Sequence, residues 1–331
     1  MTRLRVAVLP LAVSLVLAVP LAVPATGSDA VPQPGGTFVG IDSLTYQSAG
    51  PAVPGIGDEI YYGPSFDVVC GLGQHYERVM REFAKLANVI EQSGRKVVFT
   101  VVPDKYLARP DLIDAAQLPH GYCDSAGRAA QSDLLDRFDD PAYLPLRKAL
   151  SDKTRQLYWR TDLHWTTVGA SVFAKSLADR LDPAVGRRQH YTYGTETRLG
   201  DLSIYLGSTA PETLETAVPL THTKVRPKGA EKDWSYPAIT FDHSWSSRPV
   251  RHTWPGRTLL LGDSFLWYAL ENLRPVFGHG RFLWSGHVDD SVVLSAIKRA
   301  DTVVIEGYQF LLPFTPMLSQ SFRSQVRKVL R

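Results

Sequence analysis

The chain has 331 residues, of which 44% are hydrophobic and 21% are charged, a balance typical of a soluble protein with a buried core. Its formal net charge is +3, and 34 basic residues against 33 acidic ones remain once Arg3 and Arg5 are set aside. So small an imbalance excludes a general electrostatic case for binding nucleic acid. No Cys/His cluster has the spacing of a zinc site, and we expect neither a metal nor another cofactor.

The first 25 residues have the layout of a secretory signal. A short basic start, Thr2–Arg5, precedes the largely apolar stretch Val6–Val23 and a small-residue exit at Ala25. The same stretch could instead stay as a membrane anchor, although its two prolines weaken a bilayer-spanning helix. We therefore expect a signal peptide or anchor over residues 1–25, export to the extracellular space or cell envelope, and one functional domain over residues 31–331.

The chain contains two cysteines, Cys70 and Cys123. In an exported protein the simplest interpretation is one disulfide that closes a loop of about fifty residues. Two buried free thiols, or one reactive thiol, are the alternatives.

The predicted elements alternate between strands and helices. Apolar residues at helical spacing from Tyr76 onward indicate a helix, and the continuous apolar run that ends at Val102 is typical of a strand buried on both faces. In chain order we predict a short strand at Thr37–Val39, a helix at Tyr76–Gln92, strands at Lys96–Val102 and Leu157–Trp159, a helix at Val168–Leu181 capped by Thr166 or Thr167, a strand at Thr258–Leu261, a helix at Phe265–Leu273, a strand at Phe282–Trp284, a helix at Ser291–Arg299 and a strand at Thr302–Glu306. This order predicts an α/β fold with a doubly wound parallel sheet.

Residues 183–255 interrupt the alternation and are expected to form a loop-rich insertion. Polar and proline-containing pieces such as Arg187–His190 and Lys224–Gly229 carry several basic residues. A solvated surface is the plainer interpretation of these residues, and a rim that meets an acidic glycan is the functional one.

Two short segments carry the chemistry. Asp162 and His164 form an Asp-x-His pair, and Ser264 follows an apolar strand in the sequence Gly-Asp-Ser-Phe. A serine hydroxyl becomes nucleophilic when a histidine takes its proton and a carboxylate orients that histidine. The alternatives are a loop hydrogen-bond pair for Asp162 and His164, and an ordinary helix start for Ser264, with Asp263 as its cap.

These segments resemble the alginate O-acetyltransferase AlgX/AlgJ-like family, whose SGNH hydrolase-like domain is circularly permuted. The resemblance rests on four blocks in the family's order: Val101–Lys105, Arg160–Thr166 with Gly169–Ala170, Gly200–Leu202 with Leu206–Gly207, and Leu260–Phe265. It implies Ser264 as the nucleophile, His164 as the base and Asp162 as the orienting carboxylate. Relatives often carry a Glu-Arg pair after the last strand, whereas Gly307, Tyr308 and Gln309 follow Glu306 here.

Four further residues are predicted to bind substrate or to support the oxyanion. Gly262 would leave space for the substrate beside the backbone N–H of Ser264, which is the candidate oxyanion donor. Trp165 could form a sugar platform or pack in the core, Lys105 could border the cleft or make a structural ion pair, and Tyr308 could offer a hydroxyl.

Three functions remain open at this stage. The first is O-acetyl transfer to an exported polysaccharide or cell-wall glycan, with an acetyl group supplied by a membrane acyltransferase. The second is a carbohydrate acetylesterase that uses water as acceptor, and the third is a non-catalytic glycan-binding scaffold. The resemblance favours transfer.

Overall fold

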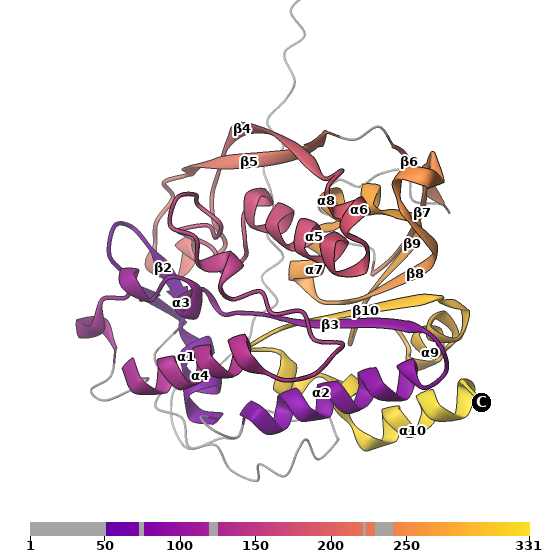
Figure 1. Cartoon of the computed structure of the whole chain (residues 1–331). Helices are drawn as coiled ribbons and strands as arrows, with labels where there is room; N and C mark the ends of the chain where they lie inside the picture. Colours follow the sequence, from indigo (N-terminus) through magenta and orange to yellow (C-terminus); the bar gives the residue numbers. More distant parts are fainter. Residues whose placement is uncertain (1–50, 73–75, 119–124, 221–222, 229–240) are drawn as a thin grey trace, which may run out of the picture. The chain divides into compact units, whose positions relative to one another are not determined.

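A mixed six-stranded sheet organises the part of the chain that the computed structural model describes, which is residues 51–72, 76–118, 125–220, 223–228 and 241–331 (Figure 1). In spatial order the strands are β3 (Lys96–Val102), β10 (Thr302–Tyr308), β8 (Trp254–Gly262), β9 (Phe277–Trp284), β7 (Asp242–Arg248) and β6 (Lys224–Lys228). The first four are parallel, β7 pairs antiparallel with β9, and β6 pairs antiparallel with β7. The predicted α/β class is confirmed, with a sheet that is mostly parallel.

Helices cover both faces of the sheet. On one face lie α2 (Tyr76–Glu91), α9 (Asp290–Arg299) and α10 (Gln320–Val329), and on the other lie α5 (Thr167–Leu181), α7 (Ser264–Tyr268) and α8 (Leu270–Leu273) (Figure 1). Val303 and Ile305 of β10 face the first layer, and Val304 between them faces the second. Because successive side chains of a strand point to opposite faces, a strand covered on both sides must be apolar throughout.

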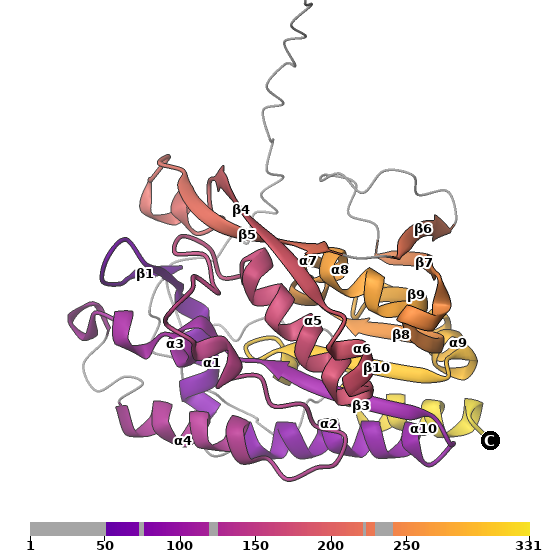
Figure 2. The same ribbon diagram turned by 45° about the horizontal axis from the view of Figure 1, so that its top comes forward.

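The other elements surround this core. They are β1 (Ala52–Pro54), β2 (Ile60–Tyr62), α1 (Gly63–Leu72), α3 (Lys105–Ala108), α4 (Ser125–Arg137), α6 (Pro183–Gly186), β4 (His190–Arg198) and β5 (Glu212–Leu220). Strands β4 and β5 form an antiparallel hairpin that crosses over α5, as Figures 1 and 2 both show. Ala217 of β5 donates its backbone N–H to the Thr167 hydroxyl (2.9 Å), which fixes the hairpin to the start of α5.

Several predicted elements are confirmed. Strand β3 has the predicted bounds, α2 ends one residue before the predicted Gln92, and Gly94 takes the left-handed backbone (φ 83°) that ends the turn. Thr166 caps α5 by accepting the N–H of Gly169. Strands β8, β9 and β10 contain the predicted strands and are longer, because neighbouring strands supply ladder partners for the flanking residues.

Three predictions are wrong. Leu157–Trp159 is not a strand: it makes one bridge, Tyr158 to Trp165, because its backbone groups bond within its own loop. The helix predicted over Phe265–Leu273 is two short helices, α7 and α8, which meet at Ala269. Residues 183–255 are not mainly loops, since β4, β5, β6 and β7 lie there and two of them extend the sheet. Their polar composition fits a half-exposed hairpin and the edge of a sheet.

Some predictions fall outside the described residues. These are the signal peptide or anchor over residues 1–25, the strand at Thr37–Val39, and Cys123. Cys70 lies within α1, but its side chain is not among those described, so the disulfide stays a prediction. Within the ranges that are described, no helix is both long enough and apolar enough to cross a membrane.

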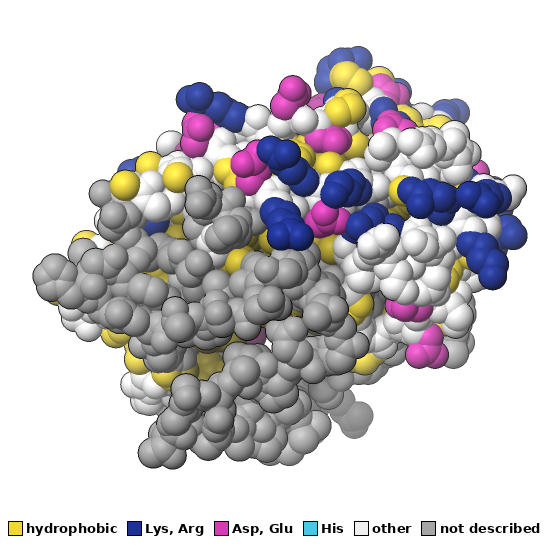
Figure 3. All heavy atoms as spheres, turned by 90° about the horizontal axis from the view of Figure 1, so that it is seen from below, with side chains coloured by type: hydrophobic (Ala, Val, Ile, Leu, Met, Phe, Trp, Pro, Cys, Tyr) yellow, Lys and Arg dark blue, Asp and Glu magenta, His cyan; other side chains and the backbone are white. Residues whose placement is uncertain are grey.

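The helical face opposite α5 is solvated and carries charges of both signs. Figure 3 views the molecule from this side, and Asp and Glu lie among the Lys and Arg side chains. Ion pairs join Arg81 to Glu77 and Lys85 to Glu82, and Arg323 of α10 also reaches Glu82. Toward one end of this face (right in Figure 3) Lys and Arg gather with few acidic neighbours, so the charges are balanced only around these pairs.

A buried lysine ties three segments together beneath the hairpin. Lys105 is 2% exposed, and its ammonium lies 2.8 Å from the Glu59 carboxylate. It also donates to the carbonyls of Ile60, Trp159 and Arg160 at 2.8, 2.7 and 2.6 Å. Burial lowers the pKa of Lys105, and the negative charge of Glu59 opposes that shift. The cation therefore joins β2 and α3 to the loop that follows residue 157.

We predict that Lys105→Met destabilises the protein by about 3–5 kcal/mol, because it leaves Glu59 as an unpaired buried charge. Lys85→Met is the matched control, since the ammonium of Lys85 is exposed and its pair with Glu82 is worth less than about 1 kcal/mol. Denaturant unfolding of both variants measures the difference. Equal losses would show that the buried pair does not hold these segments together.

Candidate active site

Ser264 stands where a central strand becomes a helix. Strand β8 ends at Gly262, and Ser264 is the first residue of α7. Asp263 caps this helix as predicted, accepting the backbone N–H groups of Phe265 (2.9 Å) and of Tyr308 (2.7 Å). Because Tyr308 ends the neighbouring strand β10, this one carboxylate fixes the serine turn to the sheet.

The loop that carries Asp162 and His164 is held by side chains from outside it. The Glu212 carboxylate of β5 accepts the backbone N–H groups of Arg160 (3.1 Å) and Thr161 (2.9 Å). On the other side, Leu202 donates its N–H to the carbonyl of Thr161 (3.0 Å). A Cβ at Gly200 would lie 2.3 Å from that carbonyl oxygen, so only glycine fits there. This contact explains why the Gly200–Leu202 block stands in this sequence.

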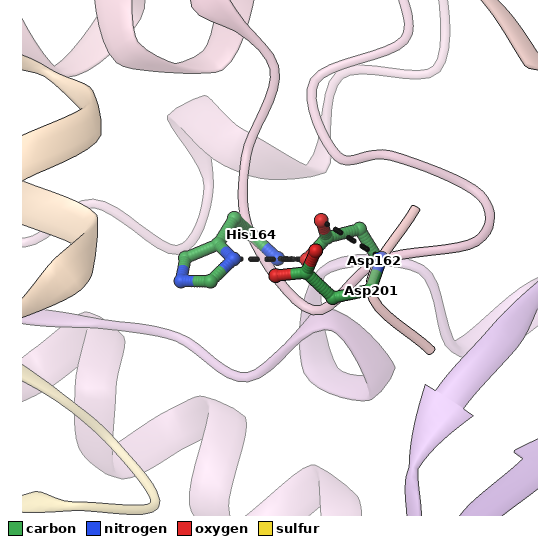
Figure 4. Close-up of side chains that lie close together, drawn as sticks. All are labelled: Asp162, His164 and Asp201. Atoms are coloured by element: carbon green, nitrogen blue, oxygen red, sulfur yellow. Dashed lines mark hydrogen bonds and ion pairs between the residues drawn. The ribbon is translucent and has the colours of Figure 1, made fainter. Parts of the chain in front are cut away.

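Three side chains form one line of hydrogen bonds. Nδ1 of His164 lies 2.9 Å from Oδ1 of Asp162, and Nε2 lies 2.9 Å from the Ser264 hydroxyl oxygen. Figure 4 shows the Asp162 end of this line. A carboxylate can only accept, so Nδ1 donates to it and Nε2 is left to accept the serine proton. The two motifs, one hundred residues apart in sequence, are thus brought into direct contact.

Asp162 is built to stay ionised. It is 1% exposed, and burial alone would raise its pKa. The charge of the His164 ring and hydrogen bonds from the His164 side chain, the His164 backbone and the Asp201 backbone together outweigh burial, so the pKa lies well below its usual range. Asp162 therefore stays ionised to lower pH than an ordinary aspartate.

Asp201 lies beside this pair, as Figure 4 shows. Burial, and then the charge of Asp162, raise the pKa of Asp201. Ligand atoms of Asp162, His164 and Asp201 lie within 4.8 Å of one another, which is the spacing of a metal site. Both nitrogens of His164 already face a partner, so a metal would have to break one of those hydrogen bonds. The arrangement suits proton transfer better than metal binding.

Aromatic rings enclose the imidazole. The His164 ring centre lies 4.8 Å from that of Phe265 and 4.4 Å from that of Tyr268. The Arg198 guanidinium lies 4.1 Å from the Trp159 ring centre and donates to the Tyr268 hydroxyl (3.3 Å). Sequence reasoning missed Tyr268 and Arg198, because nothing in their local pattern relates β4 to α7.

Glu306 is a further residue of the site whose role sequence reasoning missed. It is fully buried at the end of β10, and its Oε2 accepts the backbone N–H of Asp263 (3.0 Å). Burial, and then the charge of Asp263, raise the pKa of Glu306 well above its usual range. Burial also raises the pKa of Asp263, but the N–H groups of Tyr308 and Phe265 oppose that shift, so Glu306 is the acid of the pair that holds a proton more readily. An acidic residue in an otherwise apolar strand was the available signal.

Two of the residues predicted to bind substrate lie in the interior. Trp165 is 1% exposed and packs against Phe173 and Phe265, with ring centres 5.3 Å away in both cases. Tyr308 is 2% exposed, and its hydroxyl donates to Asp104 at 2.6 Å. Neither side chain can meet a substrate. Trp165 is core packing, and Tyr308 belongs to a buried polar network.

The other two predicted residues also have structural roles. Lys105 is the buried cation described above, and its ion pair was the plainer of its two interpretations. At Gly262 a Cβ would lie 2.4 Å from Oε2 of Glu306 and 2.7 Å from Cδ2 of Leu266. The missing side chain thus makes room for Glu306 and for α7, and not for a substrate.

Solved structures share this fold. The O-acetyltransferase domain of Pseudomonas putida AlgJ is 18% identical, with a TM-score of 0.50 over 84% of this chain and 98% of that one. Bacillus cereus PatB1 is 13% identical, with a TM-score of 0.54 over 79% of this chain and 98% of that one. Pseudomonas aeruginosa AlgX is 16% identical, with a TM-score of 0.51 over 84% of this chain and 65% of that one. At identities this low, the likeness shows a shared fold alone.

The sequence itself identifies the family. The model of the SGNH hydrolase-like domain of the acetyltransferase AlgX matches residues 60–238, more than half of the chain. The chain therefore belongs to this acetyltransferase family, as its four sequence blocks indicated. No curated protein matches the sequence.

We predict that Glu306→Gln makes the stability of the protein less sensitive to rising pH. The folded-state pKa of Glu306 is raised. Its contribution to the free energy of unfolding is therefore fully present below the unfolded-state pKa and is lost as the pH rises through the folded-state pKa. A glutamine still accepts the Asp263 N–H but carries no proton to lose. Between about pH 5 and pH 8, the thermal midpoint of the variant should fall less than that of the wild type.

Glu271→Gln is the control for this experiment, because Glu271 is the exposed residue of α8, and it should follow the wild-type curve. If Glu306→Gln follows the wild-type curve as well, Glu306 does not have a raised pKa in the folded protein.

Proposed function

We propose that this protein is an O-acetyltransferase that carries an acetyl group on Ser264 and passes it to a hydroxyl of an exported glycan. The observation behind the proposal is the unbroken line from Asp162 through His164 to Ser264, with both hydrogen bonds at 2.9 Å. The family model describes an acetyltransferase domain, and this supports acetyl as the transferred group.

The first half-reaction loads the serine. Ser264 Oγ attacks the acetyl carbonyl of the donor while its proton moves to Nε2 of His164. The tetrahedral intermediate carries a negative oxygen, and the N–H of Ser264 at the start of α7 is a donor for it. When the intermediate collapses, the donor's leaving oxygen takes the proton from Nε2, and the acetyl ester on Ser264 remains.

The second half-reaction reverses these steps with a new acceptor. A glycan hydroxyl gives its proton to Nε2 of His164 and attacks the acetyl ester, and the proton then returns to Oγ of Ser264 as the glycan ester leaves. Asp162 stabilises the imidazolium in each half. Phe265 and Tyr268 against the imidazole limit the water that could compete with the glycan.

The acceptor and the donor are part of the proposal. The O-acetyltransferase domain of Pseudomonas putida AlgJ has the same fold, which supports a transferase reaction for this chain. The basic start, the apolar stretch and the small-residue exit of residues 1–25 support export, where glycans of the cell envelope are accessible. Activated acetyl donors are made inside the cell, so a membrane acyltransferase is proposed to deliver the acetyl group to this protein.

Ser264→Ala is expected to lower turnover of a chromogenic acetyl ester by roughly three orders of magnitude or more, because the acyl-enzyme cannot form. Mass spectrometry of the wild-type protein after brief incubation should find the acetyl group on the peptide that contains Ser264. Ser295→Ala on α9 is the control and should retain activity. Turnover of Ser264→Ala close to that of the wild type would disprove the assignment.

The same assay separates transfer from hydrolysis. If adding an oligosaccharide yields an acetylated product, the protein is a transferase. If water alone accepts the acetyl group under all conditions, it is a carbohydrate acetylesterase that uses the same residues.

Asp162 and His164 are expected to act as one unit. His164→Ala should reduce turnover strongly, and Asp162→Asn should reduce it to a smaller extent, because oxyanion donors and binding remain. The double variant should lose about as much turnover as His164→Ala alone, since either change disables the same proton path. Losses that multiply in the double variant would show that the two residues act independently.

A further inference from the structure

Aromatic rings form a continuous row that starts at the imidazole of His164. The Tyr268 ring centre lies 4.4 Å from that of His164, and Trp267 follows 5.0 Å beyond Tyr268. Trp284, at the end of β9, has its ring centre 6.5 Å from that of Trp267. The row thus leads from α7 to the end of the neighbouring strand.

The row continues past β9. The His287 ring centre lies 5.5 Å from that of Trp284, and Phe241 stacks on His287 at 4.6 Å with an angle of 13° between the rings. Phe241 also meets Trp284 edge to face at 5.5 Å. Tyr268, Trp267, Trp284, His287 and Phe241 are called the aromatic row below.

The aromatic row lies at the edge of the core: Trp267, Tyr268 and Trp284 pack against it and stay partly exposed. Phe241 is 37% exposed, His287 is exposed, and Tyr268, Trp267 and Trp284 are half-buried. Trp165 and Trp245, which do belong to the core, are each 1% exposed. Large half-exposed rings cost burial energy unless they meet a ligand, and such rings are enriched where ligands bind.

We infer that the aromatic row is the binding surface for the acceptor glycan, an inference that rests on the proposed function. The axial C–H groups of a pyranose lie on one face of the sugar, and this face stacks on the electron-rich face of an indole. A row of rings that ends against the imidazole presents one sugar to Ser264 while the following sugars rest on Trp267 and Trp284.

Charge near the aromatic row indicates which glycan it takes. Exposed carboxylates stand close to it in the chain: Asp289 and Asp290 follow His287, and Glu271 follows Tyr268. Asp201 is exposed beside His164. The Arg198 cation, which lies over the Trp159 ring and donates to the Tyr268 hydroxyl, is one positive charge against these four carboxylates. A polyanionic uronate would be repelled here, so the row favours a neutral glycan.

The basic segment of residues 187–190 does not change this conclusion. Helix α5 begins at Thr167, close to His164, and runs about 22 Å before α6 and Arg187 follow. That distance exceeds the Debye length of about 8 Å at physiological salt, so the cations of this segment act weakly at His164.

Direct binding tests the inference without requiring catalysis. Calorimetric titration of the wild-type protein with a neutral chito-oligosaccharide and with an oligouronate of equal length should show binding of the neutral chain and at least tenfold weaker binding of the uronate. Trp284→Ala and Trp267→Ala should each weaken binding of the neutral chain about tenfold or more, and Trp284→Phe should lose less, because it keeps a ring. Tyr193→Ala is the control: this ring is 47% exposed on β4, outside the row, and its loss should not change binding.

Kinetics give the second readout. Both tryptophan variants should lose far more in acceptor use, seen as a higher KM for the oligosaccharide, than in turnover of a small acetyl ester. Unchanged affinity in Trp267→Ala and Trp284→Ala would overturn the inference, as would absence of neutral-glycan binding or tighter binding of the uronate. A wild-type protein that binds the glycan but never acetylates Ser264 would instead contradict the proposed function.

Discussion

The position of the His164 imidazole depends on buried charges that replace missing ladder hydrogen bonds. His164 stands on an irregular loop, whereas its partner Ser264 stands on the rigid end of β8. Such a loop would carry unsatisfied backbone groups if nothing bound them. Glu212 accepts two of its N–H groups, and Lys105 donates to two of its carbonyls. Because both charges are buried and paired with backbone, the loop is held firmly enough for a 2.9 Å contact to the serine.

Two other buried acids, Glu306 and Asp263, hold the turn that carries Ser264. Gly262 has no side chain, so Glu306 can approach the backbone and accept the N–H of Asp263. Asp263 in turn caps α7 and accepts the N–H of Tyr308. Burial and the charge of Asp263 raise the pKa of Glu306 well above its usual range, so the protonated form of Glu306 is favoured beside Asp263. Glu306 and Asp263 thus hold the serine turn in place, and Asp162 is the ionised acid that faces His164.

The sequence predicted the parts of the fold that local patterns control. The helical stripe from Tyr76, the apolar run of β3 and the cap at Thr166 each depend on neighbours along the chain, and all three are found. The strand expected at Leu157–Trp159 is absent because its apolar residues pack into the core from a loop, and periodicity cannot distinguish the two. Trp165, Lys105 and Tyr308 stood beside site motifs in sequence, but their side chains point into the interior, a direction that only packing decides.

The sequence by itself determined the class of fold and the family, and it predicted the roles of Asp162, His164 and Ser264, because each rests on a local motif or on the order of motifs. Tertiary structure alone decided which groups surround them. Glu306, Glu212 and the aromatic row come from β10, β5 and the ends of α7 and β9, and the sheet brings these segments together from positions far apart in the chain. Contacts of that kind depend on register and layer packing, which no short stretch of sequence encodes.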